Sequence, residues 1–413
     1  MPVDMLPALG AGVVLGSIAL FPGFHFAMVL MVCGPWILSQ FSLASAILCM
    51  ASAVSIAKCM HTLAVVYHPV SADNIASADP AQRLAAAGQG RYATALLGDA
   101  LWGSVQAASL ILGFTLILGM VFKTNIVKDL TKVGINLAIP AILVWGVLLF
   151  IHSKNKLGTF IAFSASGALG VIALMHPGVE GSSHAMTPLL TGLFAFPVLL
   201  ATLFEKRSRR KINLEKQPEV EVHGLLKIFG FVVGLISVVL PGLGTSSLVS
   251  IGQDLTESDA EYLTMAAFAE STGEVLALVL GIMSIASRSS DAAIIQQVIE
   301  KHSGEFALNP AFAFLLLGTL VVSCWIGLKL VKVVSFPYRI MLNLIPVKLQ
   351  ALIVAFAMIG LVWHHTSVWG MGIMIAGTLI HLGAKGLGAS NQVFFACMTV
   401  PMVLGMIQVN PFR

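Results

Sequence analysis

Long apolar stretches alternate with short polar ones along the whole chain. The apolar stretches cover these approximate ranges: 8–35, 42–66, 93–121, 134–151, 157–175, 187–204, 224–251, 260–286, 308–335, 350–364, 367–383 and 388–408. About 20 apolar residues let an α-helix cross the hydrocarbon core of a bilayer, and a helix satisfies its own backbone hydrogen bonds there. The pattern therefore predicts an all-α polytopic membrane protein.

Two of these stretches are interrupted by a Pro-Gly pair followed by other residues that disfavour a continuous helix. Pro241-Gly242 precedes the small polar cluster Gly244-Thr245-Ser246-Ser247, and Pro22-Gly23 occupies the corresponding place in the first stretch. Proline removes a backbone donor and clashes with the preceding turn, while glycine permits non-helical backbone. We therefore expect each stretch to form a broken, re-entrant hairpin whose freed backbone groups line a cavity. A pair of ordinary proline kinks is the alternative interpretation, because Gly and Pro are common in membrane helices.

The two breaks predict a chain made of two homologous halves. The first transmembrane repeat is expected at 1–204, a basic linker at 205–223 and the second repeat at 224–413. The linker begins with Glu205-Lys206-Arg207-Ser208-Arg209-Arg210-Lys211, so the positive-inside rule places it in the cytoplasm. Paired breaks in corresponding positions of two halves are typical of secondary transporters.

Composition agrees with this class of protein and excludes others. Of 413 residues, 57% are hydrophobic and 10% are charged, with a mean hydropathy of +0.93 and a net charge of +4. A soluble domain has about 25% charged residues. The small basic excess is explained by membrane topology, so no nucleic-acid partner is expected. The five cysteines lie in apolar stretches without metal-ligand spacing, which indicates neither a disulfide framework nor a zinc site.

Helix ends created by the two breaks would carry partial positive charge, which suits an anion. Guanidinium groups match carboxylate and phosphate geometry, and an arginine follows each pair of opening segments. The predicted substrate-binding residues are Pro22, Gly23, His25, Arg91, Pro241, Gly242, Gly244, Thr245, Ser246, Ser247 and Arg288. His25 would donate to the anion or carry a proton; a structural histidine bonded to a backbone carbonyl is the alternative.

Carboxylates inside apolar stretches are candidates for binding a coupling ion, H⁺ or Na⁺. Glu270 and Glu274 are one turn apart, so they share a helix face and would point into one cavity, where one of them is expected to hold a proton. Asp99 is a third candidate, although pairing with a basic neighbour would also explain it. Lys58 lies in another apolar stretch and would either neutralise substrate charge or extend to the membrane surface. Trp145 is expected at a membrane interface.

Several short motifs, in this order along the chain, resemble the TctA family, the large membrane subunit of tripartite tricarboxylate transporters, and most of all its archaeal-type branch. They are LFPGFH at 20–25, GRYATALLG at 90–98, TPLLTGLFAFP at 187–197, VLPGLG at 239–244, SRSSDAA at 287–293 and the apolar C-terminal block. The resemblance implies an ion-coupled importer of carboxylates that works by alternating access. It also implies a small membrane subunit and a periplasmic binding protein as partners, which the archaeal-type branch would not require. AESTGE at 269–274 departs from the Asn- and Thr-rich pattern of the family.

Two other functions remain open from the residues alone. A polyprenyl-phosphate carrier would use the same paired hairpins, because a phosphate head group also suits helix N-termini. An intramembrane enzyme acting on lipid would draw on His25, Asp99 and Glu270, yet none of the hydrolase, zinc-protease or phosphate-loop motifs is present in the sequence. No enzyme is therefore expected, and no cofactor beyond the coupling ion. The expected location is the cytoplasmic (inner) membrane of a prokaryote, with bound lipid and a small anionic substrate as partners; the sequence leaves a homodimer open.

Overall fold

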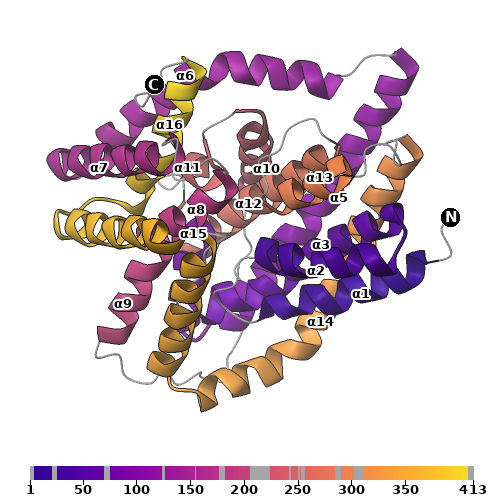
Figure 1. Cartoon of the computed structure of the whole chain (residues 1–413), viewed down its shortest axis with the longest axis horizontal. Helices are drawn as coiled ribbons and strands as arrows, with labels where there is room; N and C mark the ends of the chain where they lie inside the picture. The colour runs from indigo at the N-terminus through magenta and orange to yellow at the C-terminus, as the bar shows by residue number, and fades with distance from the viewer. Residues whose placement is uncertain are drawn as a thin grey trace.

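A computed structural model of the chain describes residues 4–20, 26–68, 75–122, 126–153, 155–175, 182–204, 224–240, 243–249, 252, 256–283, 290–301 and 310–407. Every regular element in these ranges is a helix (Figure 1). The elements of the first part of the chain are α1 (Met5–Ser17), η1 (Ile18–Leu20), α2 (Phe26–Gln40), α3 (Leu43–Tyr67), α4 (Ile75–Ala86), α5 (Gly90–Phe122), α6 (Ile126–His152), α7 (Lys156–Met175), α8 (Ser182–Leu190), η3 (Thr191–Ala195) and α9 (Phe196–Phe204). Those of the second part are α10 (Gly224–Val239), α11 (Thr245–Val249), α12 (Asp259–Ile282), α13 (Ser290–Lys301), α14 (Pro310–Leu344), α15 (Val347–Gly386), η5 (Asn391–Phe395) and α16 (Ala396–Met406).

Within the described ranges, seven helices are long and apolar enough to cross a membrane. They cover Leu43–Tyr67, Gly90–Val121, Lys156–Met175, Ala185–Phe204, Asp259–Ile282, Pro310–Leu342 and Thr366–Gly386. The outward sides of these and neighbouring helices carry large apolar side chains such as Leu110, which is 74% exposed, and Phe356, which is 66% exposed. Water would disfavour such a surface, whereas lipid tails are as apolar as these side chains. The predicted all-α, multi-pass membrane protein is confirmed.

Interrupted and joined helices mostly follow the predicted pattern. The stretch predicted at 8–35 is divided into α1 and α2, and the stretch at 224–251 into α10 and the short α11. The stretches predicted at 350–364 and 367–383 form one element, α15, which is kinked at Ser367, where φ is +53°. A positive φ is uncommon for any residue other than glycine and breaks the helical path. The boundary between those two stretches is thus a kink without a loop.

Glycines let α1 pack closely on α3 and α10 pack closely on α12. A Cβ at Gly16 would lie 2.5 Å from the Ala53 carbonyl oxygen of α3, and a Cβ at Gly234 would lie 2.7 Å from the Ala269 carbonyl oxygen of α12. Gly12 and Gly230, one turn earlier in each helix, are equally close to the partner helix. Small residues four apart are how membrane helices bring their backbones together, since lipid provides no hydrophobic driving force between helices.

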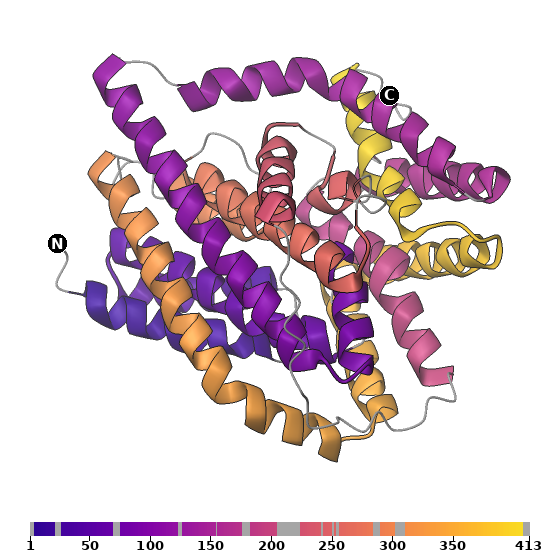
Figure 2. The ribbon, with the colours of Figure 1, turned by 180° about the vertical axis from the view of Figure 1, so that it is seen from behind.

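The first and second parts of the chain are interleaved in the centre of the protein. Helix α3 packs along α14, and α5 packs along α12. Figure 2 shows the long helices α5 and α14 beside each other across one side of the molecule. Serine hydroxyls join these pairs: Ser55 Oγ donates to the Leu320 carbonyl at 3.2 Å, and Ser104 Oγ donates to the Phe268 carbonyl at 3.2 Å. The predicted ranges 1–204 and 224–413 therefore share one core.

A second cluster of helices, formed by α7, α8, η3, α9, α16 and the later part of α15, is organised around Pro197. Proline has no N–H, so the carbonyls one turn before it lack their usual helical donor. Thr378 Oγ1 lies 2.8 Å from the Met374 carbonyl of its own helix and 3.2 Å from the Gly192 carbonyl, and His381 Nδ1 donates to the Leu193 carbonyl at 2.6 Å. The preceding turn, η3, is a π-helix. The His381 ring of α15 thus provides a donor to the Leu193 carbonyl, four residues before Pro197, in place of the missing proline N–H.

Candidate functional site

Glu270 of α12 lies inside the protein, 4% exposed, and joins three helices. Its Oε1 accepts hydrogen bonds from the Ala76 backbone N–H and from Ser246 Oγ, both at 2.9 Å. Its Oε2 accepts a hydrogen bond from Ser77 Oγ at 2.6 Å. Ala76 and Ser77 are in the first turn of α4, and Ser246 is in α11, directly after the second Pro-Gly break. The carboxylate therefore connects the two parts of the chain.

The Ala76 N–H is available to Glu270 because the N–H groups in the first turn of α4 have no acceptors within the helix. The first N–H groups of any helix lack intrahelical partners, and the partial positive charge there favours a carboxylate. Among the described residues, the partners of Glu270 are N–H and hydroxyl groups, and the described ion pairs involve other carboxylates. Glu270 is consequently held by neutral donors whose bonding depends on whether the carboxyl group carries a proton.

The polar cluster after the second break packs directly against α12. Thr245 Oγ1 donates to Ser237 Oγ at 3.1 Å, and a Cβ at Gly273 would lie 2.8 Å from Thr245 Oγ1. Gly273 therefore lets α11 approach α12 closely enough for Ser246 to reach Glu270. Gly244 precedes α11 and its carbonyl accepts from the Ser247 N–H at 3.0 Å.

Trp145 of α6 was expected at a membrane interface, and the structure contradicts that expectation. Its ring is 2% exposed, and its Nε1 donates to the Ser247 carbonyl at 3.3 Å. A buried indole needs an acceptor for its N–H, and the Ser247 carbonyl of the short helix α11 provides one. Trp145 thus supports the segment that carries Ser246.

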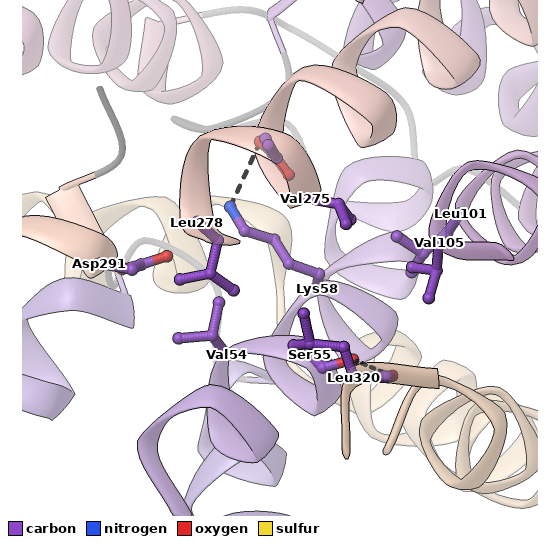
Figure 3. A pocket seen from close by; sticks show the side chains of 10 residues that line it. Val54, Ser55, Lys58, Leu101, Val105, Val275, Leu278, Asp291 and Leu320 are labelled. Carbon is purple, nitrogen blue, oxygen red and sulfur yellow. Dashed lines mark hydrogen bonds and ion pairs between the residues drawn. The ribbon is translucent and has the colours of Figure 1, made fainter. Parts of the chain in front are cut away.

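Glu274, one turn after Glu270, has a different partner. Its Oε1 lies 3.3 Å from Lys58 Nζ of α3, with 28% of the Glu274 side chain and 17% of the Lys58 side chain exposed. Figure 3 shows the lysine reaching from α3 to α12 across a small cavity. The two glutamates share a helix face, as predicted, yet Glu270 is bonded to α4 and α11 whereas Glu274 is paired with α3.

The remaining predicted site residues are either exposed or outside the described ranges. Arg91 and Asp99 are both exposed on α5, and neither is among the described partners of Glu270. The residues that lie outside the described ranges are Pro22, Gly23, His25, Pro241, Gly242 and Arg288. The structure therefore brings together Ser246 and Glu270 from the predicted set, with Thr245 and Ser247 beside them.

Helix α4 is the part of the site that the sequence did not indicate. It lies between the apolar stretches 42–66 and 93–121 and is not itself apolar, yet Ser77 is fully buried. Arg83 fixes α4 on α12: its Nε and Nη2 donate to Asp259 at 2.7 to 3.1 Å, and its Nη1 pairs with Asp79. The hydrogen bonds to Asp259 raise the pKa of Arg83 further above its ordinary value. The sequence did contain one signal for this helix: Asp79 precedes Arg83 by four residues, a spacing typical of ion pairs along a helix.

The chemistry of this arrangement rests on the hydrogen bonds of Glu270. Within the described ranges, no three His, Cys, Asp or Glu side chains are close enough to hold a metal ion together. A buried carboxylate of α12 with exchangeable partners on α4 and α11 is a group whose protonation alters helix contacts.

Comparison with known proteins identifies the class of transporter. No curated protein and no solved structure matches the chain. A model of the family described as "Tripartite tricarboxylate transporter TctA family" matches residues 6–394, which is nearly the full length. This family is not enzymatic and implies a tripartite system with a small membrane subunit and a periplasmic binding protein. With its multi-pass helical fold, the chain belongs to the TctA family of tripartite tricarboxylate transporters.

Proposed function

We propose that this subunit is a secondary active transporter that imports a small organic anion, a di- or tricarboxylate, together with H⁺ or Na⁺ by alternating access. The observation that carries the proposal is the position of Glu270, a buried carboxylate bonded at once to α4 and to α11. Ionisable groups inside membrane proteins are costly and commonly mark ion pathways. A carboxylate bonded to two separate elements is suited to link ion binding to a change in their positions.

The proposed coupling step follows from the hydrogen-bond capacity of a carboxyl group. Ionised Glu270 is an acceptor only, and it accepts from Ala76, Ser77 and Ser246. Protonation adds a donor and removes acceptor capacity, so at least one of these three contacts must weaken or reverse. A sodium ion would have a similar effect, because it would bind the oxygen atoms of Glu270 that now accept hydrogen bonds from the Ser77 and Ser246 hydroxyls. Either ion thus shifts the balance between bonded and released states of α4 and α11.

Alternating access also requires two parts that move relative to each other, and we infer that these arose by duplication. Gly12 and Gly16 of α1 approach residues of α3; Gly230 and Gly234 of α10 approach residues of α12. The residues of α3 that contact the first two glycines match the residues of α12 that contact the second two, always 216 positions apart. The four pairs are Cys49 and Met265, Ser52 and Phe268, Ala53 and Ala269, and Ile56 and Thr272. A constant register over two turns supports equivalent helix pairs in two homologous halves, each carrying a Pro-Gly hairpin.

Reconstituted liposomes test the coupling role of Glu270. Glu270→Gln keeps the size of the side chain and removes its charge. The variant, with the small membrane subunit and periplasmic binding protein that the family implies, should still exchange internal for external citrate. It should lose accumulation driven by an inward pH or Na⁺ gradient. In the unaltered protein, each coupled proton supports about tenfold accumulation per pH unit.

A matched variant and two gradients make the result specific. Glu257→Gln removes an exposed carboxylate just before α12 and should leave gradient-driven accumulation unchanged. Applying the pH and Na⁺ gradients separately identifies the ion. Normal gradient-driven accumulation by Glu270→Gln would show that the coupling ion binds elsewhere.

A further inference from the structure

A small cavity between α3, α5, α12, α13 and α14 contains three charged side chains (Figure 3). Lys58 Nζ is 3.3 Å from Glu274 Oε1, and Asp291 of α13, 2% exposed, points into the same space. The cavity residues contributed by α5 and α14, namely Leu101, Val105 and Leu320, carry no charge. Among the described residues that line the cavity, Lys58 is the one cation, and Glu274 is its carboxylate partner.

Lys58 and Glu274 occupy equivalent positions in the register described above. They are 216 positions apart, the same separation as the four pairs approached by the glycines. A second pair of helices, α5 and α14, supports this with a constant separation of 219 positions. Ser104 of α5 bonds to Phe268, and Ser323 of α14 bonds to Ser52, the residue equivalent to Phe268. The cavity residues Leu101 and Leu320 have the same separation. Equivalent residues that touch each other must lie close to the pseudo-symmetry axis that relates the halves.

This location is where transporters built from repeats bind their substrates, at the interface between the repeats. A lysine there has a direct chemical use, since its ammonium group attracts carboxylates and offers three donors. Glu274 presents the same carboxylate group to Lys58 that a carboxylate substrate would present. The cavity beside the pair is small, so a substrate carboxylate would reach Lys58 only as Glu274 moves away from it.

We propose that Lys58 binds a carboxylate group of the transported anion, and that Glu274 is the internal anion that occupies Lys58 when substrate is absent. This inference rests on the proposed transport of a carboxylate and adds the residue that recognises it. Substrate and Glu274 compete for the same ammonium group. Removing the lysine therefore weakens substrate binding, and removing the competing glutamate strengthens it.

Equilibrium binding of citrate to the purified full-length chain, measured by isothermal titration calorimetry, tests the competition. Lys58→Gln should weaken citrate binding at least about tenfold, as expected for the loss of a charge-assisted hydrogen bond. Lys58→Arg should retain most of the affinity. Glu274→Gln should tighten binding by about threefold or more. Lys329→Gln, which removes an exposed lysine lying 5.6 Å from the Trp325 ring on α14, should leave it unchanged.

The double variant Lys58→Gln with Glu274→Gln keeps the test valid if loss of one member of the Lys58–Glu274 pair prevents folding. It removes both members of the pair, so it should fold and bind citrate as weakly as Lys58→Gln. Wild-type affinity in the folded double variant, or equal weakening by Lys58→Gln and Glu274→Gln, would overturn the proposal. Because binding is measured without any gradient, loss of the proposed coupling through Glu270 would be seen separately, in the liposome assay.

Discussion

The close contact between α1 and α3 predicts that adding one methyl group to Gly16 will destabilise the protein, while the same change at Gly10 will not. A Cβ at Gly16 would lie 2.5 Å from the Ala53 carbonyl oxygen and 2.6 Å from Ile56 Cβ, whereas a Cβ at Gly10 meets nothing within 4 Å. Ordinary carbon contacts begin near 3.5 Å, so α1 would have to move from α3 by about 1 Å. The carbonyl is backbone and cannot rotate away.

The magnitude follows from two opposing effects in Gly16→Ala. Overpacking a close contact costs typically about 1–3 kcal/mol, and alanine gains about 1 kcal/mol over glycine in a helix interior. Gly10→Ala has the gain alone. We therefore expect Gly16→Ala to unfold more readily than Gly10→Ala by about 1–3 kcal/mol, and to lower the apparent Tm by a few degrees.

Reaction of buried thiols with a fluorescent maleimide during heating measures this difference. Cys49, Cys59, Cys324 and Cys397 are buried in the folded protein and become reactive on unfolding. The inferred duplication predicts that Gly234→Ala on α10 also unfolds more readily than Gly224→Ala. A Cβ at Gly234 would lie 2.6 Å from Thr272 Cβ, whereas a Cβ at Gly224 meets nothing within 4 Å. Equal stability of Gly16→Ala and Gly10→Ala would refute the packing argument.

Two further predictions concern charged groups at helix ends. Asp4 accepts hydrogen bonds from the Ser42 N–H at 2.6 Å and from the Ser45 hydroxyl at 2.9 Å, which lowers its pKa below the ordinary value of 3.8. The stabilisation is therefore present above that value and lost as pH falls through the folded pKa, so Asp4→Ala should lower the Tm at pH 7 and make a smaller difference as the pH falls below 3.8. Arg83→Lys should lose the forked hydrogen bonds to Asp259. The loss should lower the free energy of unfolding by only about 0.5–1 kcal/mol, because both side chains are partly exposed. Thermal melts of the two proteins should differ at low salt and agree in 1 M salt.

The positions of the helices and of their interruptions could be predicted because they depend on local sequence. Runs of apolar residues set the spans, and the division of 8–35 and 224–251 into separate helices follows the two Pro-Gly pairs. The close packing at Gly16 and Gly234 agrees with the small residues visible in both stretches. Which helices of the first half would pack on helices of the second could not be predicted, since one apolar face resembles another.

The chemistry of the two glutamates shows the same limit. Their spacing correctly placed Glu270 and Glu274 on one face of α12, but spacing does not specify what each side chain meets. Ser77, a buried partner of Glu270, belongs to a short polar helix that is indistinguishable in composition from a solvated loop. Lys58 was recognised as unusual in an apolar helix, yet its pairing with Glu274 depends on the interleaving of the two halves.

The two proposals meet on α12, because Glu270 and Glu274 are one helical turn apart, about 6 Å along the axis. With Lys58 paired to Glu274, the nearby negative charge is largely compensated. If a substrate carboxylate takes Lys58, Glu274 becomes uncompensated one turn from Glu270. At that separation two carboxylates repel appreciably in a medium of reduced dielectric constant, so occupancy of the substrate site favours binding of a proton or cation between them. Thermodynamic linkage makes the effect reciprocal: ion binding must favour substrate to the same extent. Exchange of partners on one lysine would thus be sufficient to bind substrate and ion cooperatively.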